Sequence, residues 1–279
     1  MKGNNDNIPL VSVCIPSYNS GLYIERTISS ILNQTFEDLE LIICDDCSTD
    51  DTVEKIRKFD DPRIRLYINE ENLGIGPNWN RCLELCRGKY IKLICADDII
   101  VPELIAREVK ILNNHSNVVA VESDTAFIDS VGRPKGSYKR YPDGPIVSGR
   151  KIARNGIFVK DYFGAPLANT FRKSVLKEIK GFDTDYKYIL DYDFFLRMAF
   201  HGDIYIIHEP LNYFRLRQSS NTDKVLSSES NVYLEEHKML LRKNRELLKL
   251  NDLEVQLSIL ARRILTAGSK LYVKRRKNT

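Results

Sequence analysis

The sequence predicts an α/β fold with a mainly parallel central sheet, flanking helices and a helical extension at the C-terminal end. Short β-rich runs alternate with helical segments of about ten residues through the first half of the chain, which is the pattern of βαβ units. Three of these runs end in polar clusters. After about residue 229 the strand signals stop, while helical periodicity continues with a break near Asn251.

The strands of the first half are expected where short apolar runs end at proline, glycine or acidic residues. These runs lie at residues 10–15, 39–44, 63–68, 90–95 and 118–122. Helices are expected between them, because apolar residues recur three or four positions apart and turn or capping residues bound each segment. These helices are expected to follow Ser20, to begin near Thr52, to open at Gly76 and Pro77, and to follow Pro102.

The second half is less regular. Residues 129–149 are rich in glycine, proline and charge, and predict a long loop or an irregular hairpin. Further elements are expected as helices around residues 172–176 and 191–200 and as a strand at residues 204–207. We expect the chain to divide into a sheet domain over residues 1–222 and a helical extension over residues 223–279.

The composition is that of a chain with a sizeable core and no membrane span. Of its 279 residues, 43% are hydrophobic and 29% are charged, which is ordinary for a globular domain. The sequence contains no run of about eighteen apolar residues. The N-terminal residues lack the apolar segment of a secretory signal. We therefore expect a cytoplasmic protein.

The six cysteines suit a reducing compartment. Most lie in apolar strand runs or on one helix, where cysteine behaves as a small buried hydrophobic residue. Cys44 and Cys47 have the spacing of a zinc-ligand pair, but no second tight pair and no histidine cluster accompanies them. We do not expect a zinc site.

Positive charge is concentrated at the C-terminal end. Residues 261–279 carry seven Lys and Arg residues and no Asp or Glu, and subtracting them from the net +4 of the chain leaves residues 1–260 at −3. A mildly acidic body argues against nucleic acid as a partner. The tail also contains apolar residues at helical spacing, which leaves two interpretations open. It is either a surface helix on an anionic membrane or a packing helix with a basic end.

The pair Asp97 and Asp98 ends an apolar run over residues 90–96. Asp is common in turns after strands, so a solvated turn is one interpretation. The other is a site for a hard divalent cation, which prefers carboxylate oxygens and often bridges to phosphates. Ligands of parallel sheets bind beyond the carboxyl ends of the strands, where the clusters at residues 16–19 and 45–46 are also expected. This convergence favours the cation site.

An ordered series of motifs accompanies these clusters. They are VSVCIPSYN at 11–19, SSILNQTF at 29–36, ELIICDDCSTDDT at 40–52, NLG at 72–74, Asn80, GKYI at 88–91, ADD at 96–98, GFD at 181–183 and LDYDFFLR at 190–197. In this order they resemble the family 2 glycosyltransferases, which have the GT-A fold. The resemblance covers roughly residues 8–220 and does not include the helical tail. It implies a nucleotide-binding half over residues 1–125 and an acceptor half over residues 126–222.

The resemblance implies that a nucleotide sugar, most of all a UDP-sugar, binds along the ends of the first strands. Pro16 and Tyr18 would lie along the base, and Asp46 would accept a hydrogen bond from a ring N–H. Asn19 and Asn80 belong to the same expected set of donor-binding residues.

The resemblance also implies a diphosphate site. Asp97 would contact the ribose or support the metal through water, and Asp98 would coordinate Mn²⁺ or Mg²⁺, which stabilises charge on the leaving diphosphate. Many relatives carry a histidine where this sequence has Arg217. We hypothesise that this fixed cation binds the diphosphate.

Two carboxylates near the start of one predicted helix are candidates for the base that deprotonates the acceptor, Asp191 and Asp193. By position alone they are equivalent, and both would also complement the helix dipole. In the family the position of Asp191 is the base. Leu190 departs from the family, since many relatives carry Glu just before the base.

The sequence thus predicts an inverting glycosyltransferase that moves a sugar to a hydroxyl of a glycan or lipid-linked acceptor, in surface polysaccharide or glycolipid assembly. One alternative is a sugar-nucleotide pyrophosphorylase, but that enzyme needs a basic, Gly-rich loop after the first strand, and residues 16–21 contain no Lys or Arg. The other is a nucleotide-sugar-binding module without catalysis, against which Asp98 and Asp191 argue.

Overall fold

The computed structural model describes residues 8–217 and 231–277. A ten-stranded sheet runs through the molecule in the order β3-β2-β1-β4-β9-β6-β10-β5, with β7 added to β6 and β8 added to β10. The strands of the first half are β1 (Val11–Ser17), β2 (Leu39–Asp45), β3 (Ile64–Ile68), β4 (Tyr90–Leu93) and β5 (Ile99–Ile100). Those of the second half are β6 (Val118–Ile128), β7 (Pro134–Tyr138), β8 (Ile146–Ser148), β9 (Asn169–Arg172) and β10 (Asp203–Arg215).

The prediction of a mainly parallel sheet is confirmed, with an antiparallel component that the sequence did not indicate. Parallel pairing joins β1 to β2 and β4, β2 to β3, and β6 to β10. Strand β9 is antiparallel to β4 on one side and to β6 on the other, so β4 and β6 point the same way. The helix expected around residues 172–176 is therefore wrong in its first residue, because Arg172 ends β9. The α-helix α6 (Leu176–Ile179) follows after a short 3₁₀ turn.

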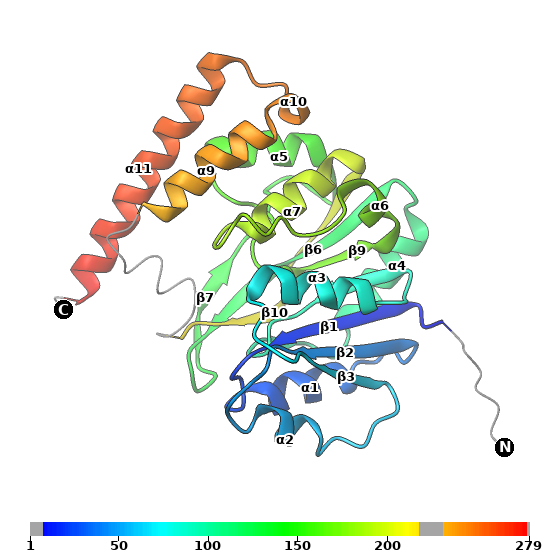
Figure 1. Ribbon diagram of the computed structural model, residues 1–279. Coiled ribbons are helices and arrows are strands. Elements are labelled where there is room, and N and C mark those ends of the chain that lie inside the picture. Colours follow the sequence, from blue (N-terminus) through cyan, green and yellow to red (C-terminus); the bar gives the residue numbers. More distant parts are fainter. Residues whose placement is uncertain (1–7, 218–230, 278–279) are drawn as a thin grey trace.

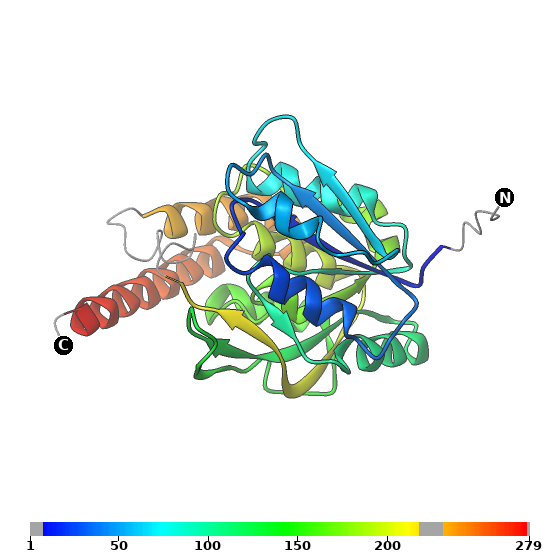
Figure 2. The same ribbon diagram turned by 90° about the horizontal axis from the view of Figure 1, so that it is seen from below.

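Helices cover both faces of the sheet (Figures 1 and 2). One apolar core includes residues of α1 (Ile24–Leu32), α2 (Thr52–Ile56) and α4 (Leu104–Asn114), and the other includes residues of α3 (Ile75–Leu85), α5 (Gly149–Phe158) and α7 (Leu190–Met198). The helices expected after Ser20 and Pro102 are present, although each begins a few residues later than its signal. Helix α5 was not expected. Its first residue, Gly149, lies so close to the backbone that an added Cβ would be 2.1 Å from the carbonyl oxygen of Ala199.

The C-terminal extension shares the core of the sheet domain. It contains α9 (Val232–Lys243), α10 (Arg245–Leu248) and α11 (Asp252–Lys277), and the break near Asn251 is confirmed. Leu240, Leu241 and Leu248 are nearly inaccessible to solvent and belong to the same apolar core as α5 and α7. Figure 1 shows α9 lying beside α7 and α5, while α11 runs on beyond the body. No helix within residues 8–217 and 231–277 has the length and apolarity that crossing a membrane requires.

Candidate active site

The polar clusters that end the first strands lie at one edge of the sheet, as expected. Because β1, β2 and β4 are parallel neighbours, their carboxyl ends are adjacent, with Ser17 beside Asp45 and Cys14 beside Leu93. The backbone N–H of Asp46 donates to the carbonyl of Ser17 across a distance of 2.8 Å. This edge is where a ligand of an open α/β sheet binds.

The first cluster combines a buried proline with an accessible aromatic ring. Pro16 is buried within β1, whereas Tyr18, just beyond the strand, is 49% exposed. Asn19 adopts a left-handed backbone with φ of 46° and links two loops. Its N–H donates to Ser48 Oγ, and its Oδ1 accepts from the N–H of Thr49, both at 2.8 Å. Tyr18 is thus carried on a loop tied down by hydrogen bonds, and the backbone N–H and Oδ1 of Asn19 are used within that loop.

Asp46 organises the loop that leads into α3. Its Oδ1 accepts hydrogen bonds from Asn69 Nδ2 at 2.7 Å and from the N–H of Leu73 at 2.9 Å, and its Oδ2 accepts from the N–H of Gly74 at 2.9 Å. Gly74 has φ of 85°, a conformation that favours glycine. The carboxylate therefore shapes the wall of the expected base pocket, and its contact with a base stays a prediction.

Asn80 has contacts that differ from the expected ones. Its Nδ2 donates to the carbonyl of Phe182 at 2.9 Å, and its Oδ1 accepts from the N–H of Phe182 at 2.8 Å. This reciprocal pair joins α3 to the loop before α7. The structure does not bring the Asn80 amide into the cluster at the strand ends, so donor binding by this side chain has no support from its contacts.

The interpretation of Asp97 and Asp98 as a solvated turn is wrong, because the two residues are only 9% and 1% exposed. Asp97 Oδ2 lies 2.6 Å from Arg217 Nε. Asp98 Oδ1 accepts from the N–H of Arg215 at 3.0 Å, while its Oδ2 is buried and has no hydrogen-bond partner among the described residues. Burial, and then the charge of Asp97, raise the pKa of Asp98 well above its usual range.

Arg215 is the site residue that the sequence analysis missed. Its side chain is 1% exposed, with Nε donating to the carbonyl of Asp97 and Nη1 to the carbonyl of Asp129, both at 2.9 Å. Its guanidinium also lies over the ring of Tyr23, 4.8 Å from the centroid. The signal was a single Arg at the end of a long β-rich segment, and nothing in the sequence pairs it with residues more than 100 positions away.

The residues fit a divalent metal that is held jointly with a substrate. The unpartnered Oδ2 of Asp98 is a hard oxygen donor of the kind that Mn²⁺ and Mg²⁺ prefer. Across residues 8–217 and 231–277, no group of three or more His, Cys, Asp or Glu side chains would enclose an ion by itself. The donor set therefore suits an ion that takes most of its ligands from diphosphate oxygens and water.

Asp191 lies in the first turn of α7 and is not completely buried. Its Oδ1 accepts from the N–H of Tyr192 at 2.9 Å, and the residue is only partly buried. Burial, and then the charge of Asp161, raise the pKa of Asp191 to about 7. A carboxyl with that pKa is poised for proton transfer near neutral pH.

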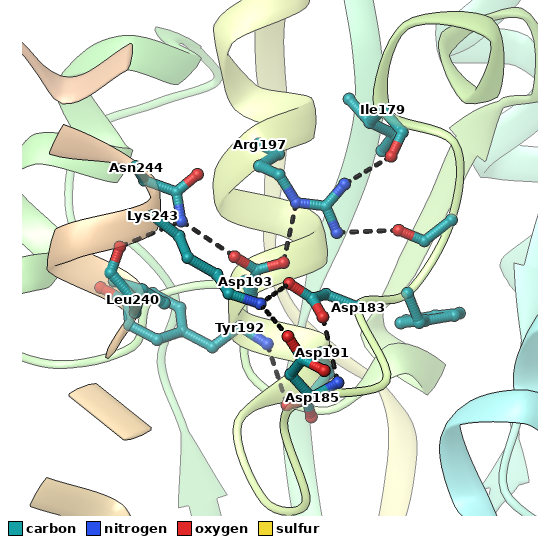
Figure 3. Close-up of polar contacts among 12 residues, drawn as sticks. Ile179, Asp183, Asp185, Asp191, Tyr192, Asp193, Arg197, Leu240, Lys243 and Asn244 are labelled. Carbon is teal, nitrogen blue, oxygen red and sulfur yellow. Dashed lines mark hydrogen bonds and ion pairs between the residues drawn. The ribbon is translucent and has the colours of Figure 1, made fainter. Parts of the chain in front are cut away.

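Both carboxylate oxygens of Asp193, by contrast, have partners within the protein (Figure 3). One oxygen lies 2.7 Å from Arg197 Nε, one turn further along α7, and the other accepts from Asn244 Nδ2 at 2.9 Å. The side chain is 2% exposed. Asp191 and Asp193, which are equivalent by their position in the sequence, therefore differ in their contacts. This difference favours Asp191 as the base.

Several of the expected site residues affect the pKa of the Cys95 thiol. Burial raises its pKa well above the usual range, and the negative charges of Asp98, Asp97 and Asp191 raise it further, while Arg217 lowers it. Charges interact appreciably only across about 10 Å in physiological salt. The charges of the acidic pair, the base candidate and the arginine therefore all act on this one thiol, which lies just after β4. Cys95, like the other cysteines, is a free thiol.

The sheet edge thus combines a buried acidic pair with a separate carboxyl of raised pKa, which agrees with the resemblance to the GT-A class. The chain belongs to glycosyl transferase family 2, whose family model matches residues 12–180. The matched region includes the acidic pair but ends before Asp191, so the base candidate rests on its contacts and on the resemblance in the later motif.

Two relatives illustrate the match. The chain is 35% identical over 234 residues to an uncharacterised glycosyltransferase of Haemophilus influenzae, covering 81% of this chain and 71% of the relative. It is 31% identical over 220 residues to a chondroitin synthase of Escherichia coli, covering 77% of this chain but only 30% of that protein. The chain is therefore similar to one part of the larger synthase.

Solved structures show the same fold. Residues 1–349 of TarS from S. aureus, in complex with UDP-GlcNAc, superpose with a TM-score of 0.70 at 21% identity, covering 89% of this chain and 70% of that one. The mannosyltransferase PcManGT from Pyrobaculum calidifontis, in complex with GDP-Man and Mn²⁺, gives a TM-score of 0.61 at 18% identity, covering 97% and 80%. The predicted GT-A fold is confirmed.

The raised pKa of Asp191 predicts a pH-dependent effect on stability. The pKa is about 7 in the folded chain against an ordinary value of 3.8, so between these values the folded state keeps a proton that the unfolded state releases. The contribution of this carboxyl to stability is therefore present at low pH and is lost as the pH rises through about 7. Asp191→Asn cannot ionise and should raise the melting temperature more at pH 8 than at pH 5.

Thermal unfolding of both proteins at the two pH values tests this. Asp185→Asn is a matched control, because Asp185 is an exposed carboxylate on the preceding loop. A difference between Asp191→Asn and the wild type that does not change with pH would contradict the raised pKa.

Proposed function

We propose that this family 2 glycosyltransferase is metal-dependent and inverting, and that it moves a sugar from a UDP-sugar to a hydroxyl of a glycan or lipid-linked acceptor in surface polysaccharide synthesis. The observation that carries the proposal is that three carboxylates have different surroundings. Among the described residues, Asp98 keeps a buried oxygen without a hydrogen-bond partner, Asp97 is paired with Arg217, and Asp191 has a pKa of about 7. The similarity to a chondroitin synthase and to TarS, which was solved in complex with UDP-GlcNAc, supports the choice of substrate.

The proposed chemistry is a single displacement. The acceptor hydroxyl attacks the anomeric carbon while Asp191 takes its proton, and the bond from that carbon to the diphosphate oxygen breaks with its electron pair leaving on the nucleoside diphosphate. Attack opposite to the leaving group inverts the anomeric configuration. Asp191 suits this role because a base with a pKa near the working pH is ionised and still binds a proton well.

The diphosphate end of the donor would lie over the Asp97–Asp98 turn. Mn²⁺ or Mg²⁺ bound there with Asp98 would supply Lewis-acid stabilisation of the leaving diphosphate. A structural neighbour was solved with Mn²⁺ and a nucleotide sugar, which supports the metal requirement. Arg217 is well placed to exchange its contact with Asp97 for a diphosphate oxygen, since guanidinium groups bind phosphates through paired hydrogen bonds.

Along the base, we propose that Tyr18 stacks on one face of the nucleobase and that Pro16 and Asp46 complete the pocket. The accessible ring of Tyr18 supports this assignment. A catalytically inactive binding module has no need of a carboxyl with a raised pKa beside the acidic pair. A pyrophosphorylase would need cations in the loop after β1, where residues 16–21 provide none.

We further propose that the protein works at the cytoplasmic face of an anionic membrane, docked through α11. Four apolar side chains spaced four, three and four residues apart form a stripe on this helix, with exposed fractions between 49% and 68%: Leu253, Leu257, Leu260 and Ile264. The opposite side of the helix packs on the body, where Ser258 donates to the carbonyl of Ile157 and Arg262 to the carbonyl of Gly156. The two interpretations of the tail thus describe two faces of one helix.

The positive charge of residues 261–279 favours an anionic lipid surface, rather than a second copy of α11, as the partner of this apolar stripe. Arg262 is buried against the body, but the other six Lys and Arg residues of the tail have no acidic residue beyond Glu254 in the sequence to offset them. Two such helices would repel each other at their basic ends. Near an anionic surface, by contrast, each cation contributes about 1 kcal/mol, and each buried leucine side chain adds about 1.5–3 kcal/mol.

Turnover with a panel of nucleotide sugars, including UDP-GlcNAc and GDP-Man, tests the function. We expect nucleoside diphosphate release with Mn²⁺ or Mg²⁺, its loss in EDTA, and a product whose anomeric configuration is inverted by NMR. Asp98→Ala should abolish turnover. Asp191→Asn should reduce it by about 10²–10⁴-fold, the usual contribution of a general base, without loss of UDP binding. Asp60→Asn, an exposed carboxylate, is the control, and product that persists in both active-site variants would defeat the mechanism.

Arg217→Ala should weaken UDP binding in the presence of Mn²⁺. Loss of a charge-assisted hydrogen bond costs about 1.5–3 kcal/mol, which corresponds to roughly a 10- to 150-fold rise in Kd. Isothermal titration calorimetry measures this directly. Arg133→Ala removes a cation whose side chain is 75% exposed and serves as the control. Equal affinities for the wild type and Arg217→Ala would remove this residue from the diphosphate site.

Cosedimentation with vesicles tests the membrane proposal. The wild type should pellet with vesicles that contain phosphatidylglycerol and much less with neutral vesicles, and added salt should release it. A Leu257→Gln/Ile264→Gln variant and a chain that lacks residues 267–279 should both lose binding. Leu22→Gln, at a residue that is 77% exposed in the turn before α1, should retain it. Equal pelleting of all variants would refute docking through α11, and a stable dimer that ignores vesicles would assign the stripe to a second copy.

A further inference from the structure

A buried carboxylate of the C-terminal extension holds the backbone just ahead of the candidate base. Glu236, on α9, is 6% exposed and accepts three backbone hydrogen bonds. They come from the N–H groups of Lys187 at 2.8 Å, Tyr188 at 3.0 Å and Ile189 at 3.0 Å. Three consecutive amides that converge on one charged acceptor form strong, directional contacts. They fix the peptide chain that enters α7 two residues before Asp191.

The same helix makes a second contact on the other side of Asp191. Asn244, which caps the end of α9, donates to Asp193 at 2.9 Å. Near it, Lys243 Nζ lies 2.6 Å from a carboxylate oxygen of both Asp183 and Asp185 (Figure 3). Asp191 therefore lies between two fixed points, residues 187–189 and Asp193, and both are set by α9.

We propose that Glu236 is a positioning residue for the catalytic base, and that α9 completes the active site by holding the first turn of α7. This role rests on the proposed function of Asp191. It requires the extension for catalysis through Glu236 and Asn244, which act on α7 and on the backbone before it rather than on the substrate. Geometry at this level matters, because a displacement of about 1 Å at a reacting group costs on the order of 10²-fold in rate.

The charge of Glu236 has a second effect that separates positioning from simple packing. Several groups act on or lie near the Asp191 carboxyl from the elements around it: Asp161 after α5, Glu236 and Tyr233 on α9, and Cys95 after β4. Burial and Asp161 contribute most to the raised pKa of Asp191, and Glu236 adds to it in the same direction. Removing the charge of Glu236 should thus lower the pKa of Asp191, which a purely structural contact would not do.

Glu236→Gln tests both effects, with Glu235→Gln as the matched control. Glu235 is the adjacent residue, loses the same charge, and is 63% exposed in a surface pair with Lys238. A glutamine offers one acceptor oxygen and an NH₂ group, so it cannot accept all three amides. Hydrogen exchange of the segment 186–190 should accelerate at least tenfold in Glu236→Gln and stay unchanged in Glu235→Gln. The Asp191 carboxyl, followed by carbon NMR during a pH titration, should ionise at lower pH only in Glu236→Gln.

These two measurements need no substrate, so they stand even if no donor in the panel is turned over. With an active donor, Glu236→Gln should lower kcat by about 10- to 100-fold, leave the KM for donor within twofold, and move the acidic limb of the pH profile to lower pH. Glu236→Asp keeps the charge but shortens the reach, so it should lower kcat without moving that limb.

The proposal is overturned if Glu236→Gln leaves both exchange and the Asp191 titration as in the wild type, or if it keeps kcat within twofold. Where Glu236→Gln fails to fold, Asn244→Ala tests the second contact, and the expected result is a lower kcat at unchanged donor KM. Unchanged turnover in that variant would equally count against α9 as the element that holds α7.

Discussion

The acidic edge of the sheet depends on the hydrogen bonds made by the buried residue Arg215. Two adjacent carboxylates with little access to water repel each other and lose solvation. Arg215 offsets this by bonding to the backbone of Asp97 and, through its own N–H, to Asp98. It can do so because β10 runs parallel to β6 for most of its length and also pairs with β5, directly after the acidic turn. A strand from the second half of the chain therefore supports the charged site of the first half.

The active site is consequently assembled from segments that are far apart in sequence. Strand ends provide the acidic pair, α7 carries the base candidate, and α9 bonds to the start of α7 and to the backbone before it. Each carboxylate has a different set of neighbours, so identical side chains acquire different chemistry. Among the described residues, Asp98 Oδ2 has no hydrogen-bond partner, whereas both oxygens of Asp193 are bonded. The same logic explains why the extension shares a core with the sheet domain, since a loosely attached helix would not fix a reacting group.

The sequence predicted the strand ends well because β-rich runs with terminal Asp residues are local signals. It did not predict β9, whose four residues take their strand conformation from β4 and β6 on either side. Nor could it predict the inward-facing charges. Lys92 lies in a strand-like run and is completely buried, and only the fold shows Glu108 2.9 Å away as its partner. Arg215 and Glu236 escaped notice for the same reason, because their partners are long-range and mostly backbone groups.

Asp191 and Asp193 show most clearly where local reasoning ends. Both lie in the first turn of α7, so propensity, capping and the helix dipole treat them alike. What separates them is the helical phase relative to α9 and to the α5 side of the core. Asp193 bonds to Arg197 and Asn244, whereas burial and then the charge of Asp161 raise the pKa of Asp191. Tertiary contacts thus separate the two carboxylates, and those made by α9 tie the C-terminal helices to the segment that carries the base candidate.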